Sequence, residues 1–115
     1  MYIYQKTMIV DFENKWSWGK GVDLICDGYG VLSVDFEDGL RWGYIKGLAV
    51  HPSKQRQGLG TRLMEAAERI IREQGFDEAQ LWVEEEHKWQ KEWYERLGYK
   101  VIMQKDGYFK MRKLL

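Results

Sequence analysis

The sequence is poor in cysteine and proline, with one residue of each among 115. A single cysteine excludes a disulfide within the chain, so a reducing cytoplasm is the expected compartment. The sequence also lacks an apolar run long enough for a signal peptide or a membrane span, and we therefore expect no association with a membrane. The formal net charge is +0, from 18 basic and 18 acidic side chains, so no overall field attracts nucleic acid or an anionic surface.

Metal-binding residues are equally scarce. The two histidines, His51 and His87, and the lone Cys26 do not have the spacing of a zinc site, so no metal is predicted. Cys26 ends the apolar run 22–26, where we expect a packed thiol rather than a nucleophile. Residues 88–96 interleave basic and aromatic side chains, but glutamates neutralise this segment, so we expect no nucleic-acid partner.

The sequence does contain enough apolar material for one core. Of the 115 residues, 44% are hydrophobic, which suits a single domain spanning residues 1–115. Apolar residues recur in β-like runs at 2–10, 22–26, 29–36 and 42–50. Asp27-Gly28 and Asp38-Gly39 separate the last three runs, and Asp-Gly between apolar runs is typical of hairpins. The first half is therefore predicted to be an antiparallel meander.

Helical periodicity begins at Leu59. Apolar residues at 63, 66, 67, 70 and 71 share one helix face, charged residues occupy the other, and Gly75 ends the pattern. On the charged face, which we expect to contact solvent, two pairs have the i, i+4 spacing of ion pairs. These pairs are Glu65 with Arg69 and Glu68 with Arg72.

The remainder of the chain predicts a strand, a helix and a hairpin. The strand covers 79–84, the helix covers 88–97 and ends at Gly98, and the hairpin pairs 99–103 with 108–115 around Asp106-Gly107. The complete order predicts an α+β fold with a mixed, mostly antiparallel twisted sheet and flanking helices.

The most informative segment, residues 50–63, joins an apolar strand to a helix start. Gly58 and Gly60 lack Cβ atoms, so a ligand can approach the backbone there and φ can be positive without strain. The unpaired N–H groups of the following helix and its dipole favour an anion at this point. The side chains flanking the glycines are those of Arg56, Gln57 and Thr61. Together these groups predict a nest for a pyrophosphate.

Two common phosphate-binding patterns do not fit this segment. The Walker A pattern requires Gly-Lys-Ser or Gly-Lys-Thr four residues after another Gly, and the dinucleotide fingerprint requires a third Gly where Leu63 stands. Residues 50–63 instead resemble the acyl-CoA loop of the GNAT superfamily of N-acetyltransferases, V-x-P-x-x-[QR]-x-x-G-x-[GA]-x-x-[LM], at every specified position. Residues 93–99, Trp-Tyr-Glu-Arg-Leu-Gly-Tyr, resemble the second family motif, L-Y-E-x-L-G-F. The resemblance covers residues 22–115.

The resemblance implies that acetyl-CoA is the cofactor. Its pyrophosphate is expected on Gln55, Arg56, Gln57, Gly58, Gly60 and Thr61, and its pantetheine arm along Leu48, Ala49 and Val50. Oxyanion stabilisation is expected from a backbone N–H near Leu48 or Val50. Tyr94 stands at the tyrosine of the second motif and is the expected acid for the leaving thiolate, because a phenol with a pKa near ~10 can protonate it. The alternative for Tyr94 is a helix tyrosine with one side in the core.

The general base is harder to place. The strand positions where family members often carry a catalytic glutamate correspond to Tyr44 and Trp82, and neither is a carboxylate. Glu84, two residues beyond Trp82 on the same strand face, is the expected substitute. The candidates behind it are Glu85, His51 and His87. The acidic run 84–86 is alternatively a polar strand end, or a group of charges that attracts a cationic amine. His87 stands where the family often has an asparagine, so its ring either hydrogen-bonds the cofactor or caps the helix.

The departure from the family lies before residue 22. Family members usually have two helices between the first and second strands, which help to build the acceptor pocket, but only residues 11–21 are available here, enough for one helical turn or a loop. We therefore expect a minimal fold that lacks most of these helices, with a shortened acceptor site and apolar surface that a homodimer would cover. Trp16 and Trp18 are expected either to line an acceptor groove or dimer contact, or to pack under a loop.

The sequence thus predicts an N-acetyltransferase that transfers an acetyl group from acetyl-CoA to a primary amine, of a small molecule or a polypeptide, by direct attack on the thioester. The alternative is a catalytically degenerate module that binds acyl-CoA or a protein partner in a regulatory or assembly role. The intact loop and Tyr94 favour the enzyme, whereas the absent carboxylates and helices favour the alternative. Fold likeness alone does not separate the two.

Overall fold

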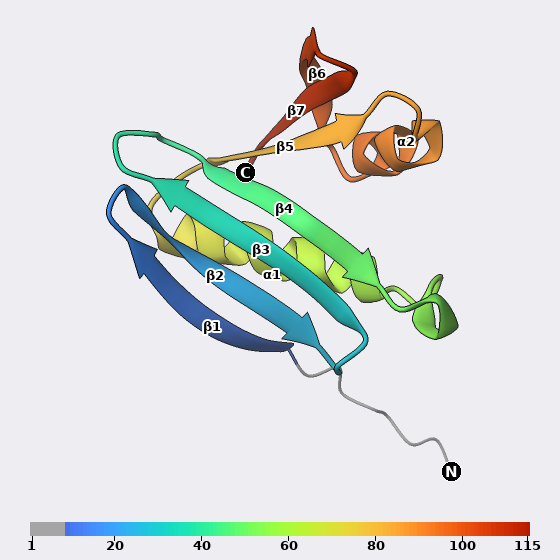
Figure 1. The fold of residues 1–115 in the computed structure, drawn as a ribbon, viewed down its shortest axis with the longest axis horizontal. Coiled ribbons are helices and arrows are strands. Elements are labelled where there is room, and N and C mark those ends of the chain that lie inside the picture. The colour runs from blue at the N-terminus through green and yellow to red at the C-terminus, as the bar shows by residue number, and fades with distance from the viewer. Residues whose placement is uncertain (1–8) are drawn as a thin grey trace.

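The computed structural model describes residues 9–115, which form one seven-stranded sheet and two α-helices (Figure 1). The order of the strands in the sheet is β1-β2-β3-β4-β5-β7-β6. All neighbours are antiparallel except β4 and β5, which are parallel. The elements in chain order are β1 (Ile9–Trp16), β2 (Gly19–Cys26), β3 (Gly30–Glu37), β4 (Gly43–Val50), η1 (Pro52–Lys54), α1 (Leu59–Glu73), β5 (Glu78–Glu84), α2 (Lys88–Arg96), β6 (Lys100–Lys105) and β7 (Tyr108–Leu114). The predicted α+β class, with a mixed and mostly antiparallel sheet, is confirmed.

The predicted Asp-Gly hairpins are present where left-handed backbone is needed. Asp27 and Gly28 have φ values of 51° and 73°, and Asp106 and Gly107 have 52° and 83°. Two successive positive φ values are the signature of the tight turn whose twist matches paired strands, and Asp-Gly adopts it at low cost. The turns therefore join β2 to β3 and β6 to β7 as antiparallel pairs, as the sequence predicts.

The expectation of a helical turn or loop at residues 11–21 is wrong. β1 continues to Trp16, a turn occupies residues 17–18, and β2 begins at Gly19. Pairing over the whole length of β2 overrides the weak local pattern. The glycines of β2 make room for Trp16, since a Cβ atom on Gly21 would lie 2.9 Å from its ring. Of the first predicted strand, residues 9–10 belong to β1 and residues 2–8 lie outside the described chain.

Trp16 and Trp18 have different surroundings. Trp16 is half-buried against the glycines of β2, whereas 56% of Trp18 is exposed. The two rings contact each other edge to face, with centroids 5.0 Å apart. Trp16 therefore packs on the sheet itself, and Trp18 is not a core residue.

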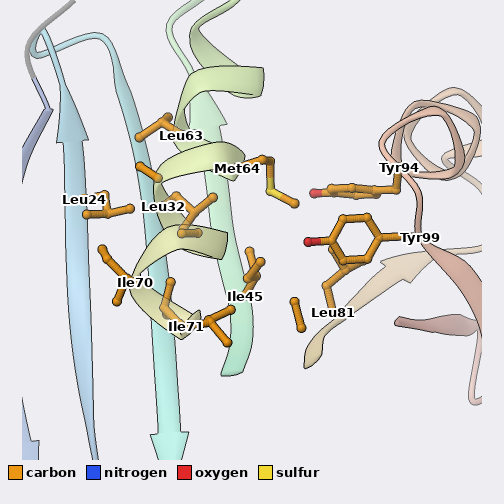
Figure 2. Packing of buried hydrophobic residues seen from close by; sticks show 14 of the residues in the cluster. Leu24, Leu32, Ile45, Leu63, Met64, Ile70, Ile71, Leu81, Tyr94 and Tyr99 are labelled. Carbon is orange, nitrogen blue, oxygen red and sulfur yellow. The ribbon is translucent and has the colours of Figure 1, made fainter. Parts of the chain in front are cut away.

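Both helices pack on one face of the sheet. The core between α1 and the strands includes Leu24, Leu32, Ile45, Leu63, Met64, Ile71 and Leu81 (Figure 2). Helix α2 lies on the same side, because Lys91 Nζ is 5.4 Å from the centroid of the Phe109 ring, and Phe109 pairs with Val83, which is buried in this core. Within residues 9–115 no helix covers the opposite face. Neither of the two described helices has the length and apolar composition that a membrane crossing requires.

Cys26 belongs to the same core. Its side chain is fully buried, and burial, followed by the negative charge of Asp27, raises the pKa of the thiol above its ordinary value. A protonated, inaccessible thiol is a poor nucleophile. The prediction of a packed, unreactive cysteine agrees with this placement.

The surface of α1 differs from the prediction at Glu68. Neither predicted i, i+4 pair forms, and Arg69 instead lies 4.0 Å from Glu73. Glu68 is not on the solvent side: only 6% of it is exposed, and its carboxylate contacts Tyr99 and Lys113. Polar partners from distant parts of the chain allow this carboxylate to be buried.

The parallel strands β4 and β5 separate soon after they meet. They pair only at Gly43 with Ala79 and at Tyr44 with Gln80, and beyond that point the two strands diverge (Figure 1). A bulge at Gly47, where φ is 67°, shifts the register between β3 and β4. Bulges bend a strand and increase its twist. The end of β4 is thus a strand edge without a partner in the described sheet, and the functional site lies beside it.

Candidate functional site

A cavity of about 900 Å³ opens between the end of β4, the start of α1 and helix α2. It brings together most of the residues that the sequence assigned to a site. The predicted residues that line it are Leu48, Ala49, Val50, Gln55, Arg56, Gly58, Gly60, Thr61 and Tyr94. Gln57, Glu84 and His87 are not among its lining residues. Residues more than thirty positions apart in sequence thus meet at one place, as a site shared by strand, loop and helix requires.

The loop before α1 has the backbone of an anion nest. Arg56 and Gly58 both have left-handed backbone, with φ values of 64° and 82°. Gly58 is the N-cap of α1 and has no side-chain cap, so the first N–H groups of the helix have no partner within the helix. Successive N–H groups around left-handed residues, at the positive end of a helix, form a concave site for phosphate oxygens.

Side chains within the loop stabilise this conformation. Gln55 Nε2 donates to the carbonyl of Val50 at 3.2 Å, and Gln57 Nε2 donates to the carbonyl of Ser53 at 3.4 Å. His51 Nδ1 accepts from the N–H of Ser53 at 3.1 Å and so caps the short helix η1. Gln57 and His51 therefore have structural roles in the loop.

The cavity has a local positive charge although the chain is neutral. The charged residues that line it are Lys54, Arg56, Arg96 and Glu92, three cations and one anion. Lys54 lies over the Tyr29 ring at 5.1 Å, and none of the three cations forms an ion pair with another described residue. Unpaired cations beside a backbone nest are suited to a ligand with several negative charges.

Helix α2 contributes lining residues that the sequence reasoning missed. Trp89, Trp93 and Arg96 face the cavity, and 68% of Trp89 is exposed. A Cβ atom on Gly60 would lie 3.4 Å from the Trp93 ring, so Trp93 closes against the start of α1. The signal was available, because positions 89, 93 and 96 recur at the helical spacing of one face.

Tyr94 reaches the cavity from the buried side of α2. Only 8% of it is exposed, and it is the one buried residue of this nine-residue helix. Its hydroxyl points toward α1, near Met64 (Figure 2). Burial raises the pKa of Tyr94 to about 12, because an apolar environment disfavours the phenolate. Tyr94 is therefore a protonated hydrogen-bond donor throughout the physiological pH range.

The expected base and its neighbours lie at the end of β5. Glu84 Oε2 is 3.6 Å from His87 Nδ1, and both side chains are more than 40% exposed. Glu85 accepts a hydrogen bond from Gln104 Nε2 at 2.6 Å. His87 is the N-cap residue of α2, but its ring makes no capping hydrogen bond. Within the described residues, no three potential metal ligands cluster.

Comparison with known proteins agrees with this arrangement. The acetyltransferase (GNAT) family matches residues 25–99. A search among curated proteins finds no match. Among solved structures, the PaiA N-acetyltransferase of Thermoplasma acidophilum, in complex with coenzyme A, has a TM-score of 0.71 and 21% identity, over 83% of this chain and 60% of that one.

Two further structures show the same fold at lower identity. A GNAT family acetyltransferase from Staphylococcus aureus has a TM-score of 0.70 and 16% identity, over 84% of this chain and 68% of that one. A GNAT family acetyltransferase from Elizabethkingia anophelis, with acetyl-CoA bound, has a TM-score of 0.69 and 14% identity, over 84% and 76%. The chain thus spans 60% of the length of the Thermoplasma protein and about three quarters of the Elizabethkingia protein. With the family matched over residues 25–99 and the same fold in these structures, the chain belongs to the GNAT family of acetyltransferases.

Proposed function

We propose that the protein is an N-acetyltransferase that uses acetyl-CoA and acetylates a primary amine. The observation that carries this proposal is that one cavity contains the nest around Gly58, the edge of β4 that β5 leaves unpaired, and the Tyr94 phenol. Family membership and the coenzyme A found in related structures support the same ligand.

Each part of the proposed ligand has cavity residues of matching chemistry. The N–H groups at Gly58, Gly60 and Thr61 bind the pyrophosphate, with Arg56 and Lys54 supplying charge. The amides of the pantetheine arm pair with the backbone of Leu48 to Val50, which β5 does not use. Trp89 and Trp93 supply flat apolar surface beside these groups. Bound acetyl-CoA supplies an activated acyl group as a thioester.

Tyr94 is the proposed proton donor. Its pKa of about 12 keeps the proton on the phenol until negative charge develops nearby, and the hydroxyl then donates to the leaving sulfur. The same apolar surroundings raise the pKa of a thiol, so the thiolate is a stronger base in this cavity than in water. A backbone N–H near Leu48 or Val50 is the proposed oxyanion donor.

Glu84 remains the proposed base. It is the last residue of β5, across the opening from the end of β4. The proton that Glu84 takes from the amine can pass to the nearby ring nitrogen of His87. The acceptor is proposed to approach across the sheet face that the described helices leave uncovered. That face carries Lys110, whose Nζ lies 5.5 Å and 5.6 Å from the ring centroids of Trp42 and Trp82.

Two observations favour a second function, a catalytically degenerate module that binds acyl-CoA or a protein partner. Tyr44 and Trp82 stand at the strand positions where family members often have a catalytic glutamate. The hairpin of β1 and β2 leaves no room for the two helices that family members usually have between their first two strands. A homodimer that covers the exposed apolar surface stays a prediction for the chain under either function.

Calorimetric titration with acetyl-CoA tests the cofactor. The double variant Gly58→Glu/Gly60→Glu introduces one carboxylate at the nest and a second between the start of α1 and Trp93, both within the cavity lining, and should abolish binding. The matched control is Gly39→Glu/Gly75→Glu, which adds the same charge at glycines with φ of 87° and 89° and open space around them, outside the cavity. Binding by the wild type and the control alone supports the proposal. Absence of binding by the wild type contradicts it.

Turnover then separates the enzyme from the binding module. With a panel of primary amines, Tyr94→Phe should lower kcat by roughly a hundredfold or more, as expected for loss of a general acid, and leave the affinity for acetyl-CoA unchanged. Binding without turnover of any amine would favour the degenerate module.

A further inference from the structure

A buried polar cluster lies beside Tyr94, and none of its three residues, Glu68, Tyr99 and Lys113, lines the cavity. Tyr99 Oη donates to Glu68 Oε2 at 2.9 Å, and Lys113 Nζ donates to Glu68 Oε1 at 2.8 Å. Tyr99 and Glu68 are 1% and 6% exposed. Lys113 Nζ also lies 5.8 Å from the centroid of the Tyr99 ring. Both carboxylate oxygens are thus used, and the cluster joins α1, the start of β6 and β7.

This cluster contacts Tyr94 through Tyr99. The N–H of Tyr99 donates to the carbonyl of Tyr94 at 3.0 Å, as in a typical helix end after Gly98, whose φ is 103°. The two phenol rings pack edge to face, with centroids 6.0 Å apart and an interplanar angle of 70°. Figure 2 shows the two rings next to each other, with both hydroxyls directed toward α1. Tyr99 therefore touches Tyr94 through both its backbone and its ring.

The hydroxyl of Tyr99 adds a connection that a phenylalanine would lack. Glu68 belongs to α1, the helix whose first residues line the cavity. The hydrogen bond from Tyr99 to Glu68 therefore links the ring that packs on Tyr94 to α1, the helix that carries the phosphate nest at its N-terminus. Tyr94 is the one buried side chain of helix α2, and the aromatic rings that contact its phenol are those of Trp93, at 5.1 Å between centroids, and Tyr99.

Stability alone is a weak reason for this cluster. Removing a carboxylate and an ammonium from water has a large cost, and a hydrophobic replacement of similar volume is often as stable or more stable. Hydrogen bonds that use both carboxylate oxygens, however, define a unique geometry. The cluster is thus better suited to fixing positions than to adding stability.

We propose that Tyr99, anchored by Glu68 and Lys113, is a positioning residue that holds the Tyr94 hydroxyl in the cavity; this inference rests on the proposed acetyl transfer. Tyr99 touches neither the cavity nor a ligand in this arrangement. Its effect passes through Tyr94, so it concerns the proton donor and not the binding of acetyl-CoA.

The test is the variant Tyr99→Phe in the full chain, which removes one oxygen atom and keeps the ring. We expect kcat to fall on the order of ten- to a hundredfold, because a small misplacement of a catalytic group has effects of this size, while KM for acetyl-CoA and its calorimetric affinity stay unchanged. In a Tyr94→Phe background the same change should have no further effect on kcat. The matched control for kcat, Tyr29→Phe, removes the hydroxyl of a tyrosine that is 43% exposed, keeps the ring beneath Lys54, and should leave kcat unchanged. Tyr108, which is 41% exposed on β7, pairs with Glu84 and serves as a control for the spectroscopic measurement only.

A spectroscopic measurement keeps the inference separate from the proposed function. In protein labelled with 3-fluorotyrosine, the ¹⁹F signal of Tyr94 is assigned by its disappearance in Tyr94→Phe. We expect Tyr99→Phe to shift or broaden this signal, and Tyr108→Phe to leave it in place. If the wild type acetylates no amine, the proposed function fails, and the ¹⁹F signal still reports on positioning. An unchanged Tyr94 signal, or an equal loss of kcat with and without Tyr94, overturns the inference.

Discussion

The same substitution, glycine to alanine, should have opposite effects at the two glycines of the loop before α1. Gly58 has φ of 82° and ψ of 5°, with no atom within 4 Å of a Cβ placed there. An alanine in this left-handed conformation costs about 1–2 kcal/mol. Gly60 lies in the first turn of α1, and a Cβ there would lie 3.4 Å from the Trp93 ring, an ordinary contact distance. Alanine is favoured over glycine in a helix by up to about 1 kcal/mol.

These magnitudes predict that the free energies of unfolding of Gly58→Ala and Gly60→Ala differ by about 1–3 kcal/mol. Urea unfolding followed by tryptophan fluorescence measures the difference. Gly60→Ala should also keep its affinity for acetyl-CoA, since the new methyl group faces Trp93 and not the nest. If residue 58 relaxes out of the left-handed region, the strain appears instead as an affinity for acetyl-CoA that is weaker by roughly five- to thirtyfold. A Gly58→Ala variant with both stability and affinity unchanged would refute the reasoning.

Two further predictions concern buried titratable groups. Burial raises the pKa of Tyr94 from 10.0 to about 12, so above pH 10 the unfolded chain loses this proton while the folded chain keeps it, and the free energy of unfolding should fall by about 2 kcal/mol between pH 10 and pH 12. Urea unfolding at stepped pH should show this part of the loss in the wild type and not in Tyr94→Phe; parallel losses in both proteins would contradict the argument. Cys26 is fully buried with a raised thiol pKa, so a thiol reagent should modify the folded protein at least roughly a thousandfold more slowly than the urea-unfolded protein. A folded-state rate close to that of the unfolded thiol would show that the β2 strand end opens readily.

Local patterns in the sequence predicted the parts of the fold that depend on local chemistry. The turn at Asp27-Gly28 needs two left-handed residues, and Asp-Gly supplies them whatever the rest of the chain does. The nest before α1 likewise depends on Gly58 and on a helix start a few residues away. The nest could therefore be predicted from local chemistry, whereas the placement of Leu48 to Val50 and of Tyr94 in the same site came from the resemblance to the GNAT family.

The features that the sequence did not predict depend on distant contacts. Residues 11–21 have little local preference for helix or strand, and the pairing of β1 with β2 decides their conformation. Glu68 has the helical phase of a solvent-facing residue, but its partners Tyr99 and Lys113 lie 31 and 45 positions away. The spacing of Trp89 and Trp93 shows that they share a helix face, but the packing of α2 beside the start of α1 decides that this face lines the cavity. No pattern within a short window contains these relationships.

The divergence of β4 from β5 also has a consequence for aggregation. An unpaired strand edge is the usual place where another chain adds a strand, and this sheet has such edges within its interior as well as at β1 and β6. The outer strand β6 has lysines at both ends and a register irregularity between Val101 and Met103, features that discourage strand addition. The inner edges, those of β4 and β5 that face each other, are protected differently. The two strands are hydrogen-bonded at Tyr44 and Gln80, so the gap between them is closed at that end. Because the gap is closed at one end, a full strand from another molecule cannot pair with both β4 and β5. A single extended ligand with amide groups can pair with one of the two strands.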